Sequence, residues 1–467
     1  WDLALVALVA AVPVVLFFAY PTYPNYDAYY DLVWGRELLH GVTPTFDAYK
    51  APTQHPLYVA LGALLSLLGT GAERVLVAIT IASLIALVWA VQRLGSRIFG
   101  AWPGAAAAVF VGTSFAFLLY AVRAYVDVPF LALVGWAAVL AADGRRDRAV
   151  FLLLFLAGLL RPEAWVLAGL YWLWRRPEWS PRMRVLAAGA VVAAPVLWAL
   201  SDWAVTGDPL HSLHATSDLA DELGRTRGVG DLPGAFVSFL SGTVKAPVAL
   251  GALAGAVLAW RRLDRRALAV PLGLFAAGAL TFLLTGIAGL SILPRYLTVP
   301  AVALCLFAGY ALVGFTTLPP GATRRRWSRL AAGAAVLGLV FAIAKAPSVG
   351  KLTGELRFVG ALHANLDTLV HAPAVRRGLA CGPITFPSYR GVPDTRWLLD
   401  LPQGRVGARS AKRRPYGVEV FVLGEKALRR YGFAQGASPR TNVPDPGYVP
   451  VARTPRLSAY ARCPAAR

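Results

Sequence analysis

The chain has 467 residues, of which 57% are hydrophobic and 15% are charged, and its mean hydropathy is +0.56. Because ordinary soluble domains carry about 25% charged residues, this composition argues against a soluble enzyme. Forty-six Lys and Arg against 25 Asp and Glu give a net charge of +21. We attribute this excess to loops beside apolar segments and to the C-terminal tail, and we expect no nucleic acid partner.

Apolar runs of roughly 15 to 20 residues recur along most of the chain, a pattern typical of a polytopic helical membrane protein. We expect about nine full spans, near residues 3–20, 74–92, 102–120, 128–142, 185–204, 244–260, 267–286, 297–315 and 330–346. The shorter apolar segment at 56–70 is expected to be interfacial or re-entrant. Residues 149–174 form either two half-length helices that meet at Arg161-Pro162-Glu163 or a single span.

Arginine-rich loops follow alternate spans, at 93–97, 145–148, 175–184, 261–266 and 324–329. The positive-inside rule makes these loops cytoplasmic. The opposite loops are then outside the cell, at 21–55, 121–127, 205–243 and 287–296, together with everything after 346. The sequence therefore predicts a multi-pass protein of a prokaryotic plasma membrane.

After residue 346 the chain changes character, because Gly, Pro and charged residues are dispersed among short apolar runs such as 418–423. We expect a transmembrane domain over 1–346 and a small α/β domain over 347–467 on the outer face. The tail is basic, with 19 Lys and Arg against 7 Asp and Glu over 351–467. Cys381 and Cys463 both lie in it, and an exported compartment permits a disulfide between them; two unpaired thiols are the alternative.

The first outer loop contains a candidate catalytic acid. Tyr, Trp and Leu interleave with charged residues from about 26 to 40, which predicts an amphipathic surface helix. Asp27 would then lie at the level of the lipid headgroups, just past the first span. Two alternatives stay open: Asp27 only caps this helix, or Asp31, one helical turn further on, is the reactive acid.

A second acid, Asp127, lies at the outer mouth of a span, where a charge is costly and usually faces a cavity or a partner. Arg123 is one turn away as a counter-ion, and a local ion pair between them that anchors the helix end is the alternative. Three further outer cations, Lys50, His55 and Arg295, join Arg123 in a set that would converge on an anion. Arginine suits phosphate through its bidentate geometry, although Arg295 would also fit the interface by snorkelling.

Acids and cations on one membrane face suit group transfer from a phospholipid-linked donor. A carboxylate removes the proton of the acceptor hydroxyl, and cations neutralise the departing phosphate. The acids Asp218, Asp221 and Glu222 offer oxygen atoms for a hard cation, but a solvated helix face is the favoured interpretation. A divalent cation stays possible, and we assign no metal site and no cofactor.

Several short stretches carry a resemblance to a known family. An acidic first outer loop, followed by "KAPTQHPLY", "RAYVDVP", "LLRPEAW" and "LPRYL", resembles the GT-C glycosyltransferases, in particular the branch of protein O-mannosyltransferases and lipid A aminoarabinose transferase. The resemblance covers the layout of residues 1–346. It implies an all-α polytopic fold with re-entrant or half-length helices, and an inverting enzyme that uses polyprenyl-phosphate sugars.

The resemblance also implies roles for single residues. Asp27 matches the acid of the first loop, assigned as the base, and Asp127 matches a second acid near the donor. His55 falls where aminoarabinose transferases have a lysine that contacts the lipid phosphate, and Arg295 would contact phosphate or sugar. The expected acceptor is a cell-envelope glycan, lipid or protein.

Two other classes of protein remain open. A transporter or flippase of a lipid-linked sugar would usually show internal repeats and midplane charges in broken helices, and neither is visible in this sequence. A non-catalytic membrane protein that binds surfaces would make the outer acids dispensable. The expected partners under the transferase hypothesis are the donor, the acceptor and membrane lipids.

Overall fold

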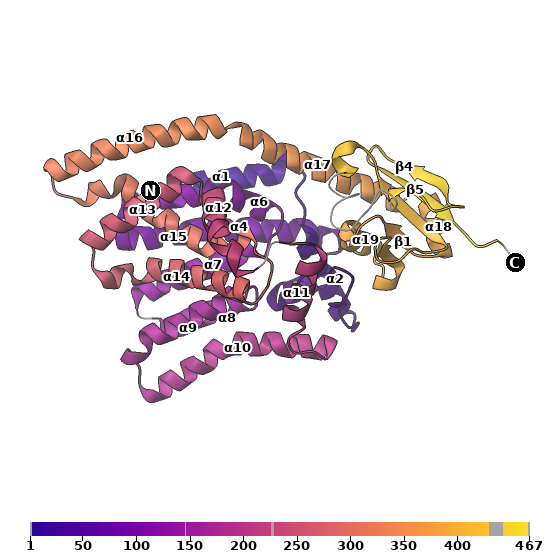
Figure 1. Cartoon of the computed structure of the whole chain (residues 1–467), viewed down its shortest axis with the longest axis horizontal. Coiled ribbons are helices and arrows are strands. Elements are labelled where there is room, and N and C mark those ends of the chain that lie inside the picture. Colours follow the sequence, from indigo (N-terminus) through magenta and orange to yellow (C-terminus); the bar gives the residue numbers. More distant parts are fainter. Residues whose placement is uncertain (1, 145, 226–227, 429–441, 466–467) are drawn as a thin grey trace.

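The computed structural model describes residues 2–144, 146–225, 228–428 and 442–465. Residues 1, 145, 226–227, 429–441 and 466–467 lie outside this description, among them Arg145 of one basic loop. A bundle of helices forms most of the molecule, and a small domain with a β-sheet lies at one end of its long axis (Figure 1).

The bundle is formed by the first sixteen α-helices. In chain order they are α1 (Asp2–Ala19), α2 (Tyr26–Leu39), α3 (Pro56–Ser66), α4 (Ala72–Phe99), α5 (Ala101–Gly112), α6 (Phe115–Val122), α7 (Asp127–Asp143), α8 (Asp147–Gly158), α9 (Glu163–Arg175), α10 (Pro181–Thr206), α11 (His211–Glu222), α12 (Leu232–Val244), α13 (Ala246–Arg262), α14 (Arg265–Ile287), α15 (Thr298–Val313) and α16 (Ala322–Lys345). A short 3-10 helix, η4 (Pro294–Leu297), leads into α15.

The helices confirm a multi-pass membrane protein. Within the described residues, five helices are long and apolar enough to cross a bilayer, and the number is seven if two bent pairs each count as one span. Helices α5 and α6 meet at an angle of 57°. The helical segment 229–244, which contains α12, meets α13 at an angle of 103°. Of the nine expected spans, five match these helices and two match the bent pairs. The other two, 3–20 and 128–142, correspond to shorter helices, since the apolar part of α1 is Ala4–Ala19 and α7 has 17 residues.

One helix forms the centre of the bundle. Residues 298–310 of α15 are all buried, whereas the 18-residue apolar window of α16 is only 11% buried. Gly309 allows α15 to approach α5 closely, since a Cβ at this position would lie 2.5 Å from the carbonyl oxygen of Pro103. The exposed apolar surface of α16 is what a lipid-facing helix presents.

The short segments behave as expected from their length. Helices α8 and α9 have 12 and 13 residues and meet at Arg161-Pro162, which confirms two half-length helices within 149–174. Pro162 cannot continue the hydrogen bonding of α8, so the chain turns there. Helix α3 has 11 residues, and at about 1.5 Å per residue it is too short to cross a hydrocarbon core of about 30 Å.

The basic loops gather at one end of the bundle. The turns from α7 to α8, from α9 to α10, from α13 to α14 and from α15 to α16 all lie away from the sheet domain (Figure 1). The end of α4 joins them, because Arg97 forms a 2.6 Å ion pair with Asp143 at the end of α7. The arginine clusters expected on one side of the membrane therefore do lie at one end of the fold.

The C-terminal domain is a small α/β unit, as expected. Its elements are α17 (Pro347–Val370), α18 (Pro373–Cys381), β1 (Ile384–Phe386), η6 (Tyr389–Gly391), α19 (Val392–Leu399), β2 (Val406–Ala408), β3 (Gly417–Val422), α20 (Glu425–Ala427), β4 (Val449–Arg453) and β5 (Leu457–Arg462). The strand order is β2-β1-β3-β5-β4. Strand β1 is parallel to β2 and β3, whereas β5 is antiparallel to β3 and β4. A disulfide joins Cys381 to Cys463, as expected.

The expectation of a surface helix at 26–40 is wrong. Residues 28–35 of α2 are buried, and α2 packs between α3 and α19 of the C-terminal domain. Arg36 donates to the carbonyls of Arg396 and Trp397 at 2.8 and 3.0 Å and pairs with Asp400 at 3.0 Å. The polar residues of α2 therefore bind a second domain, which lies too far along the chain for an amphipathic pattern to reveal.

Candidate functional site

Two cavities adjoin beside the start of α2. The first has a volume of about 400 Å³ and lies between the first loop, α11 and the C-terminal domain. The second, of about 360 Å³, lies between the α8–α9 turn, α10 and α14. Five residues line both cavities and form the boundary between them: Asp27, Thr53, Thr216, Arg295 and Tyr296. Molecules bound in the two cavities would meet at this boundary.

An open ion pair lies at this boundary. Arg295 donates from Nη1 to Asp27 Oδ2 at 3.0 Å, and each side chain is 24% exposed. Asn25 caps α2, because its side-chain oxygen accepts from the backbone N–H groups of Asp27 and Ala28 at 2.8 and 3.3 Å. The carboxylate of Asp27 is therefore not needed as the helix cap and faces the cavities.

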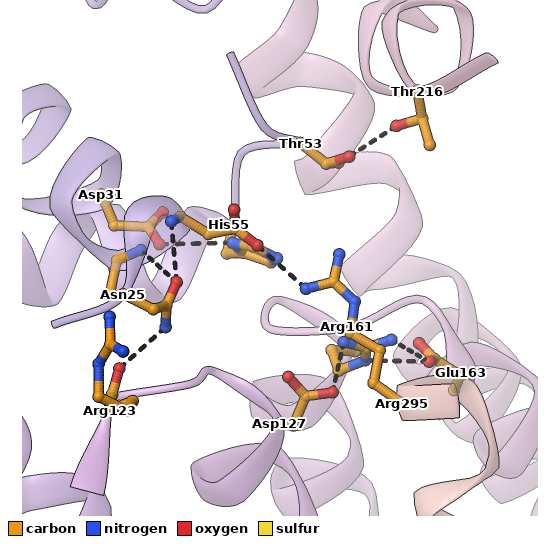
Figure 2. A network of polar contacts seen from close by, with 12 residues as sticks. Asn25, Asp31, Thr53, His55, Arg123, Asp127, Arg161, Glu163, Thr216 and Arg295 are labelled. Atoms are coloured by element: carbon orange, nitrogen blue, oxygen red, sulfur yellow. Dashed lines mark hydrogen bonds and ion pairs between the residues drawn. The ribbon is translucent and has the colours of Figure 1, made fainter. Parts of the chain in front are cut away.

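A closed cluster lies nearby, in which Arg161 stands between two carboxylates (Figure 2). Its Nη1 is 2.7 Å from Asp127 Oδ1, and its Nη2 is 2.6 Å from Glu163 Oε1. All three side chains are at most 7% exposed. The ion pair of Arg161 and Glu163 closes the tip of the half-helices, and Asp127 joins it.

The expected pairing of Arg123 with Asp127 is wrong. One-turn spacing applies only within a helix, whereas α6 ends before Arg123 and α7 begins at Asp127. Between them Ala124 has a positive φ of 53°, so the chain reverses. The sequence separation of four residues therefore says nothing about distance here.

Arg123 instead holds the loop that leads into α2. It donates to the carbonyls of Tyr23 and Pro24 at 3.1 and 3.4 Å, and its guanidinium lies over the Tyr23 ring. Asn25 donates back to the carbonyl of Arg123 at 3.0 Å. Arg123 lines the first cavity, and its contacts fix the segment that carries Asp27.

His55 lines the second cavity, with Asp31 next to it. Nδ1 of His55 lies 3.5 Å from Asp31 Oδ2. Asp31 is 1% exposed and is not among the residues that line either cavity. Burial raises the pKa of the Asp31 carboxyl, and the neighbouring imidazole acts against this shift. This position disfavours Asp31 as the acid that meets a substrate.

The C-terminal domain completes the first cavity, which no sequence motif indicates. Tyr389, Arg390 and Asp394, from η6 and α19, line it together with Lys50. Nζ of Lys50 is 3.9 Å from Glu222. Among the described residues, no group of three or more His, Cys, Asp or Glu is arranged to hold a metal ion.

The overall fold is similar to that of ArnT, a GT-C membrane glycosyltransferase, which confirms the resemblance at the level of the fold. The solved structures similar to this chain include ArnT from Cupriavidus metallidurans bound to undecaprenyl phosphate, with a TM-score of 0.61 at 15% identity over 98% of this chain and 97% of that chain. The apo state of ArnT gives a TM-score of 0.59 at the same identity and coverage.

An oligosaccharyltransferase from Archaeoglobus fulgidus in the apo form gives a TM-score of 0.48 at 13% identity, over 87% of this chain and 64% of that chain. No family model matches the sequence, and no curated protein matches it. At 15% identity the likeness to ArnT establishes the fold, and the chemistry must be argued from the residues of this chain.

Proposed function

We propose that this protein is an inverting glycosyltransferase that moves a sugar from a polyprenyl-phosphate donor to a cell-envelope acceptor. The observation that carries the proposal is the open pair of Asp27 and Arg295 at the boundary of two cavities. The fold of ArnT, whose structure was solved with undecaprenyl phosphate, supports it. Donor and acceptor would enter from different sides and react beside Asp27.

The second cavity suits the donor. Apolar side chains such as Leu160, Trp165 and Trp198 line it, and Arg295 and His55 lie on its polar side. A prenyl chain prefers the apolar part, whereas the phosphate needs cations that neutralise it in a site shielded from water. We assign the phosphate to Arg295 and His55, and Asp127 shapes this pocket through Arg161 rather than by contact.

The first cavity suits the acceptor. Tyrosines and the cations Lys50, Arg123 and Arg390 line it, and aromatic faces with polar side chains bind carbohydrate and headgroup surfaces well. An acceptor hydroxyl in this cavity would reach Asp27, which removes its proton. The oxygen then attacks the anomeric carbon as the bond to phosphate breaks on the opposite side, which inverts the configuration.

We place this site on the extracytoplasmic side. The arginine-rich turns lie at the opposite end of the bundle, and such loops are cytoplasmic by the positive-inside rule. The proposed division into a transmembrane catalytic domain, 1–346, and an outer domain, 347–467, falls between α16 and α17. Both domains line the first cavity, so the outer domain takes part in acceptor binding.

The test is a transfer assay with the purified full chain in lipid nanodiscs. A panel of radiolabelled polyprenyl-phosphate sugars is mixed with bacterial envelope extracts, and the label is followed into products. We expect one donor to give a glycosylated product, and Asp27→Asn to lower the rate by about 10² to 10⁴-fold. Flux of labelled lipid across proteoliposomes without any transfer would overturn the proposal in favour of a flippase.

A further inference from the structure

The second cavity contains a cation of a different chemical kind from its arginines. Of the cationic side chains that line it in the described part of the chain, two are arginines, Arg161 and Arg295, and the third is His55. A guanidinium keeps its protons in proteins, whereas an imidazole gains and loses one near neutral pH. His55 is therefore the cation here that is able to transfer a proton.

The arrangement around His55 is that of an oriented imidazole. Its Nδ1 faces Asp31 at 3.5 Å, and Asp31 is buried at 1% exposure. Among the described residues, neither oxygen of Asp31 nor Nδ1 of His55 has a hydrogen-bond partner, so the two groups meet as an ion pair. A carboxylate behind an imidazole fixes its orientation and stabilises the protonated ring.

The backbone also fixes this position. The carbonyl of His55 accepts from the N–H groups of Tyr58 and Val59 at 2.8 and 2.9 Å, at the start of α3. The ring meets Trp198 of α10 edge to face, with centroids 6.3 Å apart. With Nδ1 turned to Asp31, Nε2 lies on the far side of the ring, and Figure 2 shows Arg295 beyond that side.

Charged groups from several elements lie in the second cavity or contact His55. Four carboxylates and two guanidiniums, from α2, α10, the α8–α9 turn and η4, line this cavity with His55 or, in the case of Asp31, contact it directly. They are Asp27, Asp31, Asp202, Glu163, Arg161 and Arg295. Asp202 accepts hydrogen bonds from Gln54 and Ser212. The hydroxyl of Tyr58 in α3 donates to a backbone carbonyl. Both groups therefore have partners other than His55.

We propose that His55, oriented by Asp31, donates a proton from Nε2 to the departing phosphate, while Asp27 accepts the proton of the acceptor hydroxyl. The inference rests on the proposed function. The new bond joins the acceptor oxygen to the anomeric carbon, and the bond from that carbon to the phosphate oxygen breaks, leaving its electron pair on this oxygen. The proton of His55 then converts the prenyl phosphate product into its monoanion, and the proton on Asp27 leaves through solvent.

The experiment is a pH profile of kcat for the full chain in nanodiscs, with the donor found in the transfer assay. The wild type should give a bell-shaped profile, whose alkaline limb reports loss of the proton from His55. His55→Gln should lower kcat by about 10² to 10⁴-fold and remove the alkaline limb. His55→Lys should keep the KM for the donor but not kcat, because it retains the charge without titrating near neutral pH.

Asp31→Asn provides a matched control, since it removes the orienting carboxylate and leaves the imidazole. Its alkaline limb should move to lower pH, because the imidazolium loses its buried partner. An unchanged alkaline limb in His55→Gln, or full kcat in His55→Lys, would overturn this inference and leave the transferase proposal intact. A folded wild type that transfers no sugar from any donor would overturn both.

Discussion

The two groups of acids and arginines near the cavities differ in one respect that decides what each is able to do. Asp27 and Arg295 form a single pair, each 24% exposed, at the boundary of two cavities. Asp127, Arg161 and Glu163 form a cluster in which one cation serves two acids and every side chain is at most 7% exposed. An open pair is able to exchange its partner for a substrate, whereas a closed cluster resists exchange because separation would strand a buried charge.

The closed cluster supports the open pair. The guanidinium of Arg161 lies over the Tyr296 ring at 5.2 Å, and Arg295 is the residue before this tyrosine. Arg161 thereby connects the tip of the half-helices, the start of α7 and η4. The closed cluster thus holds the backbone that presents Arg295, and the open pair faces the two cavities.

The largest loss of stability is expected when the cation of the closed cluster is removed. Arg161→Met leaves Asp127 and Glu163 buried without their cation, so we expect the free energy of unfolding to fall by about 3–5 kcal/mol. Thermal unfolding in detergent, followed by tryptophan fluorescence, measures this loss. Arg295→Met is the matched control, and it should change stability much less because its pair is partly exposed. Equal losses in the two variants would contradict the comparison.

A second pair of variants separates chemistry from stability. Asp27→Asn should abolish most transfer, as stated above, with little change in the unfolding temperature, because Asn25 rather than Asp27 caps α2. Asp127→Asn should instead lower the free energy of unfolding by about 1–3 kcal/mol, since it weakens a buried charged hydrogen bond of 2.7 Å. Measuring rate and unfolding temperature on the same preparations tests both. A large rate loss with full stability in Asp127→Asn would assign Asp127 to the chemistry.

The sequence indicates local features such as helix ends well, and it indicates less about which side chains contact one another. The half-helices at Arg161-Pro162 and the disulfide of Cys381 and Cys463 follow from local signals: a proline that ends a helix, and two cysteines in a tail that is expected to be exported. The expected pairing of Arg123 is wrong because helical spacing does not extend across the turn between α6 and α7. Whether residues four apart lie on one helix depends on where each helix ends, and that is set by packing.

The surface position expected for α2 is wrong for a related reason. An amphipathic pattern indicates that one face is polar, but it does not say whether water, lipid or protein covers that face. Here Arg36 and Glu37 bind α19, about 360 residues away along the chain. The contribution of Tyr389 and Arg390 to the first cavity depends on the same long-range docking, so single-sequence motifs could not reveal it.

A third cluster extends the comparison to a cation that titrates. His363 of α17 lies between Glu73 of α4 and Asp394 of α19, with ion-pair distances of 3.6 and 3.8 Å, and stacks on the Tyr23 ring. Burial alone lowers the pKa of His363, but the two carboxylates outweigh it and raise this pKa to about 9. The cluster joins the bundle to the C-terminal domain. Because His363 loses its proton as the pH rises through its pKa of about 9, we expect this cluster to weaken at high pH, unlike the arginine groups.

The smallest expected effect follows from this pKa. Because the folded pKa exceeds the ordinary value of about 6.5 for histidine, the stabilisation by His363 is complete below pH 6.5 and is lost as pH rises through about 9. His363→Gln should thus lower the free energy of unfolding by roughly 1–3 kcal/mol at pH 6, and the difference from the wild type should shrink towards pH 10. Thermal unfolding at both pH values checks this. A difference that is the same at pH 6 and pH 10 would show that His363 acts through packing against Tyr23 rather than through its charge.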